Sequence, residues 1–201
     1  RRVLFRSCVC IKAASYPDPA ANRNVKNILV EHCVLWNAEP GNAVEIGYEV
    51  RCDEISDITF RDLDIVHCEY EGNQSGGVLT IHNADRAHIH DIVYEDIRVE
   101  DAQEKFVDIK VLDSKYSLDR KRGSVENIYF RNVEILNGNF PVSIIRGFEM
   151  HTEMSRPRNI YFDNVVVLGK QVESPSDLHM VVELSDDILF NGTAHAKRNP
   201  F

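Results

Sequence analysis

Cysteine is scarce in this sequence, and the few cysteines present form neither a metal-binding pattern nor a disulfide framework. The 201 residues include five cysteines, an odd number, and none belongs to a C-x-x-C motif. Cys8 and Cys10 lie two residues apart, which places both on one face of a strand and suits a disulfide poorly. No histidine spacing matches a metal site either, so the sequence predicts neither a metal nor a cofactor.

Basic residues and long apolar runs are also in short supply. Lys and Arg total 23 against 32 Asp and Glu, which gives a net charge of −9 at pH 7. Because nucleic acids are bound by basic patches, this balance argues against a nucleic-acid partner. No stretch approaches the ~20 consecutive apolar residues of a membrane-spanning helix, so we expect no membrane partner.

The sequence does contain one phrase that returns six times. Each copy starts with Asn or Asp, continues with isoleucine, and in five of the six copies has Phe or Tyr two positions after it. The first copy has Val30 at the aromatic position. The isoleucines recur every 28 to 36 residues, at Ile28, Ile58, Ile92, Ile128, Ile160 and Ile188. A repeat of this length with strand-like content predicts a solenoid.

Each phrase is predicted to form a strand, a bend and a second strand. Apolar residues follow the phrase at two further positions of the same face, for example Leu63 and Ile65. Between the two strands lies a column that is mostly of the Asx type, which bonds its own backbone in turns. Its members are His32, Asp62, Asp96, Asn132 and Asn164.

The outward column before the bend alternates in charge. It runs Glu31, Arg61, Glu95, Arg131, Asp163. If successive units lie one strand spacing apart, about 4.8 Å, each of these side chains has opposite charges as neighbours. This pattern favours units that stack directly on one another, as in a parallel β-helix.

A third short strand is predicted in each unit. We place these strands at residues 9–12, 44–47, 79–82, 107–110, 142–144 and 182–184. Their outward columns mix carboxylates, His and Lys, with Asp108 and Ser143 expected in the same column as Glu45. The predicted fold is therefore all-β, a right-handed parallel β-helix of about six coils in one domain over residues 8–201.

The first seven residues look foreign to that domain. Arg-Arg-Val-Leu-Phe-Arg-Ser resembles the in-frame translation of a sequencing-adapter oligonucleotide. We expect residues 1–7 to be non-native and the native gene to begin upstream, which would make residues 8–201 the C-terminal part of a longer protein.

Three residues are candidates for catalysis. On neighbouring coils, Glu45 and His82 would have Cα atoms roughly 8 Å apart, and Asp85 follows in the next loop. Inverting glycosidases use an acid and a base whose carboxyl groups are about 6.5–9.5 Å apart. Glu45 also interrupts an apolar strand beside Gly47, where a ligand could approach closely.

Substrate-binding candidates lie on the same outward face and in the flanking loops. Strand alternation points Trp36 outward, where it would stack on a sugar ring, although it would also serve to close the core. Basic residues would bind carboxylates or hydroxyls of a substrate. The remaining candidates are Lys12, Asn42, Tyr48, Glu49, Arg51, Arg86 and Lys110.

From residue 8 to about 190 the chain resembles the polygalacturonase-like group of right-handed β-helix glycosidases. Residues 41–47, Gly-Asn-Ala-Val-Glu-Ile-Gly, resemble that family's Gly-His-Gly-x-Ser-Ile-Gly stretch, with Asn42 at the His position and Glu45 at the Ser position. Residues 77–82 lie where the family has Gly-Val-Arg-Ile-Lys. The resemblance implies hydrolysis of a pectin-like polysaccharide, catalytic aspartates just before Cys8, and a secreted or periplasmic location, with the cytoplasm as the alternative.

Three functions therefore stand as hypotheses. The first is a glycoside hydrolase, monomeric and acting on a carbohydrate, in which the full protein and not this segment alone performs the chemistry. The second is a non-catalytic β-helix that binds carbohydrate or displays loops. The third is a polysaccharide lyase, which would need a calcium cluster and a basic Arg or Lys.

Overall fold

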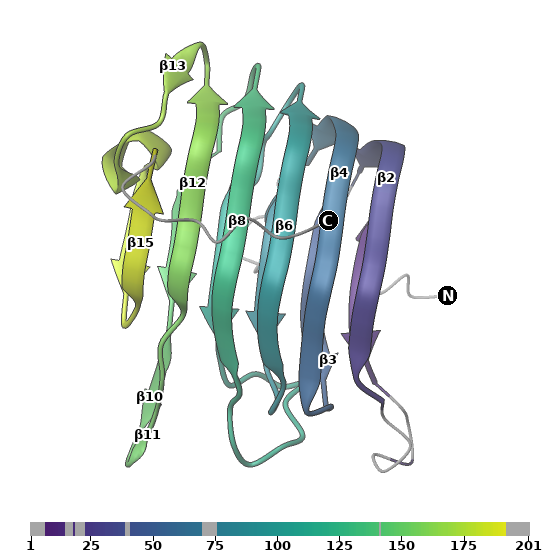
Figure 1. Cartoon of the computed structure of the whole chain (residues 1–201), viewed down its shortest axis with the longest axis vertical. Coiled ribbons are helices and arrows are strands. Elements are labelled where there is room, and N and C mark those ends of the chain that lie inside the picture. The colour runs from purple at the N-terminus through teal and green to yellow at the C-terminus, as the bar shows by residue number, and fades with distance from the viewer. Residues whose placement is uncertain are drawn as a thin grey trace.

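The computed structural model shows a parallel β-solenoid (Figure 1). It describes residues 7–14, 18, 23–38, 41–69, 76–140 and 142–191. Helical structure within these ranges is limited to the 3-10 turn η2 (Pro175–Leu178). No helix in this part of the chain is long and apolar enough to cross a membrane. The all-β prediction is confirmed, with about five turns where the sequence suggested six.

Two parallel sheets form the walls of the solenoid. Sheet A has the order β1-β3-β5-β7-β9-β14 and holds the short strands. Its strands are β1 (Val9–Ala13), β3 (Val44–Val50), β5 (Leu79–Asn83), β7 (Val107–Val111), β9 (Ser143–Arg146) and β14 (Met180–Glu183).

Sheet B holds the repeated phrase in long, bent strands. These are β2 (Val25–Asn37), β4 (Glu54–Cys68), β6 (His88–Val99), β8 (Ser124–Ile135), β12 (Arg158–Val167) and β15 (Asp186–Phe190). The short β13 (Lys170–Gln171) adds an antiparallel strand at the far edge of β12. Facing sheets of this kind bury their inner faces in one shared core.

The isoleucines of the six phrases stack in register from β2 to β15. Ile28 pairs with Ile58, and the same column continues without a shift to Ile188. Two positions on, the aromatic rings form a ladder inside the core, with centroids 4.8 Å apart between Phe130 and Phe162 and 5.0 Å apart between Tyr94 and Phe130. These stacks confirm the predicted unit-on-unit arrangement.

The predicted bends are confirmed as left-handed backbone positions inside sheet B. The bend residues have φ between 50° and 55°, and the first residue of each phrase has φ between 53° and 57°. Asn and Asp adopt this conformation more easily than other non-glycine residues. Amide side chains also link the coils, since Asn164 donates to Asn132 at 2.9 Å and Asn132 donates to Asp96 at 2.9 Å.

The alternating charges lie in one column, as predicted. Glu31 pairs with Arg61 in the sheet register, and the column continues through Glu95 and Arg131. The Arg61 guanidinium lies 2.5 Å from the Glu31 carboxylate. Arg131 instead lies over the ring of Tyr129, 4.8 Å from its centroid. The column therefore has alternating charge, and its closest ion pair joins β2 to β4.

The prediction for β9 was wrong by one residue. Asp108 aligns with Ile144, whereas Ser143 is buried and accepts a hydrogen bond from the Val107 backbone N–H. This frame places Ile145 in the core. In addition, residues 148–155 form the antiparallel pair β10 (Phe148–Met150) and β11 (Glu153–Ser155). Of the segment predicted to be foreign, residues 1–6 lie outside the described ranges.

Candidate functional site

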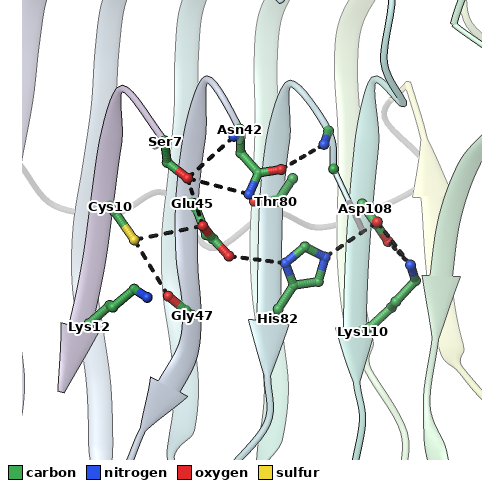
Figure 2. Close-up of polar contacts among 12 residues, drawn as sticks. Ser7, Cys10, Lys12, Asn42, Glu45, Gly47, Thr80, His82, Asp108 and Lys110 are labelled. Atoms are coloured by element: carbon green, nitrogen blue, oxygen red, sulfur yellow. Dashed lines mark hydrogen bonds and ion pairs between the residues drawn. The ribbon is translucent and has the colours of Figure 1, made fainter. Parts of the chain in front are cut away.

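A row of four ionisable side chains crosses the outward face of sheet A (Figure 2). Glu45 comes from β3, His82 from β5, and Asp108 and Lys110 from β7. The register aligns Glu45 with Asp108 through Thr80, and His82 directly with Lys110. Although they face away from the apolar core, none of the four is more than 9% exposed. We call these residues the charged row.

Direct contacts join the members of the charged row. His82 Nδ1 lies 3.2 Å from Glu45 Oε1, and His82 Nε2 lies 3.3 Å from Asp108 Oδ2. The second contact is electrostatic, because Nε2 has no partner at hydrogen-bonding angles. Lys110 Nζ lies 2.8 Å from Asp108 Oδ1 and ends the row.

The surroundings of the charged row favour the ionised forms of His82, Glu45 and Asp108. Burial by itself lowers the pKa of His82, but the charge of Asp108 and the hydrogen bond to Glu45 outweigh it, and the pKa is raised. Burial likewise raises the pKa of Glu45 and of Asp108, yet contact with His82 brings both below their usual values. When His82 is protonated, the row alternates in charge and sums to zero, which reduces the free-energy penalty of burying it.

Polar groups complete the N-terminal end of the charged row. Ser7 Oγ donates to Glu45 Oε2 at 2.7 Å, and Cys10 Sγ lies 3.7 Å from the same oxygen. Burial, followed by the charge of Glu45, raises the pKa of Cys10 to about 12, so this thiol stays protonated at neutral pH. Asn42 Nδ2 donates to Ser7 Oγ, while Asn42 Oδ1 accepts from the Gly77 N–H at 2.7 Å.

Aromatic rings cover His82. The Tyr48 ring stacks on the imidazole with centroids 4.5 Å apart, and Tyr116 packs edge-on against Tyr48 at 5.7 Å. Glycine is required at position 47, where β3 passes close to the backbone of His82 in β5. Its φ is +136°, and a Cβ there would lie 2.3 Å from the His82 carbonyl oxygen. The Tyr48 ring thus covers the imidazole of His82, which is fully buried.

Asp85, the third predicted catalytic residue, makes its hydrogen bonds to backbone groups outside the charged row. Its buried carboxylate accepts hydrogen bonds from the backbone N–H groups of Val50, Leu118 and Asp119 at 2.8 to 3.3 Å. Arg51 and Arg86, predicted to bind substrate, both contact the side chain of Asp119. These side chains anchor the loop at residues 112–119.

The other predicted binding residues are distributed over the surface. Lys12 pairs with Glu49 at 2.5 Å beside the N-terminal end of the charged row. Trp36 is 64% exposed, which confirms its outward direction, and its ring lies 5.2 Å from that of His67. Asp108 lies in the column of Glu45, as predicted, although it was not among the predicted site residues, and neither was Ser7.

A concave surface follows the bend of sheet B. It is an open groove of about 680 Å³ lined by bend residues and by charged side chains on both sides. Among its lining residues, Arg98 contacts both Asp62 and Asp64. Within the ranges that the structure describes, no three His, Cys, Asp or Glu side chains are grouped to hold a metal ion.

Comparison of the chain with models of known protein families, with curated proteins and with solved structures finds no match.

Proposed function

We propose that this β-solenoid belongs to a glycoside hydrolase that cleaves a pectin-like or related polysaccharide, with the charged row as part of its active site. The observation that supports this is a pair of carboxylates, Glu45 and Asp108, on either side of His82 on one outward face. Apolar residues at these positions would avoid the penalty of burying charges. Perturbed ionisable groups retained despite that penalty are typical of functional sites.

Glu45 is the residue to which we assign the role of general base. Its lowered pKa keeps it ionised at neutral pH, as required of a group that removes a proton from attacking water. In inverting hydrolysis a second carboxyl group protonates the leaving oxygen. The resemblance to polygalacturonase-like enzymes implies aspartates just before Cys8, on the Ser7 side of Glu45, and we assign the acid to that side.

The remaining members of the charged row are positioning residues in this proposal. His82 contacts Glu45 directly and fixes the direction of its carboxylate. Asp108 stabilises the imidazolium from the other side, and Lys110 pairs with the Asp108 carboxylate. Tyr48, which lies over His82, provides a flat face of the kind on which sugar rings stack.

The test is incubation of the complete reading frame with a panel of purified neutral and acidic polysaccharides. New reducing ends and product masses that include one added water per cleavage are the expected result. Products with a new carbon–carbon double bond would identify a lyase and contradict the proposal. Retention of a polysaccharide without any cleavage would contradict it in favour of a binding protein.

Non-catalytic carbohydrate binding is the second candidate, and the sheet B groove favours it. Its volume of about 680 Å³ falls in the range of ligand sites, and its walls present charged and amide groups that suit hydroxyls. Under this alternative, Arg98→Ala reduces polysaccharide retention in affinity electrophoresis, whereas His82→Gln leaves it unchanged. If His82→Gln reduces retention and Arg98→Ala does not, the result supports the charged row as the site that binds polysaccharide.

A further inference from the structure

The N-terminal end of the solenoid is open. Strands β1 and β2 are the last strands of sheets A and B, and no strand in the described ranges pairs with their outer edges (Figure 1). Edge strands of this kind present backbone N–H and C=O groups that a further strand can satisfy. Both sheets stop at the same level, so one added turn would cover both edges.

The core is uncovered at this end. Five inward residues of β1 and β2 are only partly buried, whereas the residues that occupy the same columns one turn on are fully buried. The partly buried residues are Val9, Val25, Ile28, Val30 and Cys33, and we call them the N-terminal face. The residues paired with them in the sheet register are all fully buried. They are Val44, Ile55, Ile58, Phe60 and Leu63.

The opposite end of the solenoid is finished differently. The far edge of β12 is shared between the parallel strand β15 and the antiparallel strand β13. The chain then folds through η2, where Val172 and Leu178 are buried. The antiparallel strand β13 occupies part of the edge of β12, so among the described strands a further parallel turn at this end could continue only from β14 and β15.

We propose that the N-terminal face binds a further turn of parallel β-solenoid. The columns define its chemistry: apolar side chains in register with Ile28, Val30 and Cys33, and a basic side chain in register with Glu31, which ends the alternating charge column. A two-fold pair of N-terminal faces would bring β2 against its own copy in antiparallel orientation, which does not continue these columns. This inference does not rest on the proposed function.

The test adds such a turn to the chain. A copy of residues 44–78 replaces residues 1–8, so that it ends directly before Val9, just as residues 44–78 end before Leu79 in the native register. The copy of Arg61 then lies in register with Glu31. We expect the Tm to rise by roughly 5 °C or more, and hydrogen exchange of the β1 and β2 amides to slow at least tenfold.

Two matched variants show whether the added turn acts through these columns. Aspartate at the copied positions of Ile58, Phe60 and Leu63 should abolish the rise in Tm. Glutamate at the copied position of Arg61 should reduce the rise, because it faces Glu31. Equal Tm values for the original chain, the extended chain and the variants would overturn the proposal.

The unmodified chain provides a second test if the extended chain does not fold. We expect it to sediment as a monomer, with β1 and β2 amides that exchange at least 100-fold faster than those of β6. A stable dimer in which the β1 and β2 amides are protected would overturn the proposal and identify a second copy as the occupant.

Discussion

His82 determines how the charged row responds to pH. Because its pKa is raised in the folded state, its stabilising contribution is fully present below the unfolded pKa of about 6.5 and is lost as pH rises through the folded value. Glu45 and Asp108 have lowered pKa values, so their contribution is present above about pH 4 and is lost as pH falls.

We therefore predict the highest Tm between about pH 4.5 and 6.5, with a decline on the alkaline side that depends on His82. His82→Gln should flatten that decline. His151→Asn is the control, since His151 lies exposed in the turn between β10 and β11 with φ of 59°, a conformation that Asn tolerates. A decline of equal slope in both variants would show that His82 is not the titrating group.

Asp85 is predicted to be a stabilising residue of the loop at 112–119. Asp85→Ala removes the acceptor of three backbone N–H groups, which should lower the free energy of unfolding by roughly 2–5 kcal/mol and expose the loop to proteases. Chemical denaturation and limited proteolysis measure both effects. Asp113→Ala, at an exposed carboxylate 3.8 Å from Arg122, should change neither by much.

At the scale of single strands, the aromatic ladder contributes several of the largest fully buried side chains. Phe130 is fully buried between Tyr94 and Phe162, whereas its neighbour Tyr129 faces outward and stacks on Tyr161. We predict that Phe130→Ala lowers the free energy of unfolding by about 3–5 kcal/mol and Tyr129→Ala by about 1 kcal/mol. Equal losses in urea denaturation would contradict the assignment of the two faces.

The bend positions make a separate prediction, at Asn132. Its φ is 51°, and its amide links Asp96 to Asn164. Asn132→Ala should lower the free energy of unfolding by about 1–2 kcal/mol, because alanine is strained in this conformation. Asn132→Gly should recover part of that loss, since glycine adopts it freely. A glycine variant less stable than the alanine variant would show that backbone strain is not the cause.

Sheet B was predictable because its constraints lie within each repeat. Isoleucine, the aromatic residue and the Asx bend each specify a position, so the register follows from the sequence alone. In β9, by contrast, Ile144 and Ile145 are adjacent, and either one fits the inward column. In the structure Ile145 lies in the core. The register of β9 depends on the neighbouring turns and not on the local sequence pattern.

The candidate site was predictable only in part, for a related reason. Glu45 and His82 meet because they lie one turn apart in adjacent strands, which the repeat length determines. Asp85 instead contacts N–H groups of Leu118 and Asp119, in a loop of irregular length. No sequence period governs such a contact, so its role as a loop anchor appears only in the structure.

At the scale of the whole molecule, each turn contacts only its neighbours. Stability in such proteins is approximately a sum of terms for single repeats and for the interfaces between them. The N-terminal face lacks one interface that every internal turn has. Sheet A ends there beside Ser7 and Glu45, so an added turn would extend the surface next to the charged row.

The most direct test of the charged row as a catalytic centre compares two glutamates of sheet A. Glu45 lies in the row, whereas Glu183 forms an exposed ion pair with Arg146 at 2.7 Å on β14 and β9. In the complete reading frame, we predict that Glu45→Gln lowers kcat for polysaccharide hydrolysis by about 100-fold or more, while Glu183→Gln leaves it within about twofold. Equal kcat values for the two folded variants would contradict a catalytic role for the charged row.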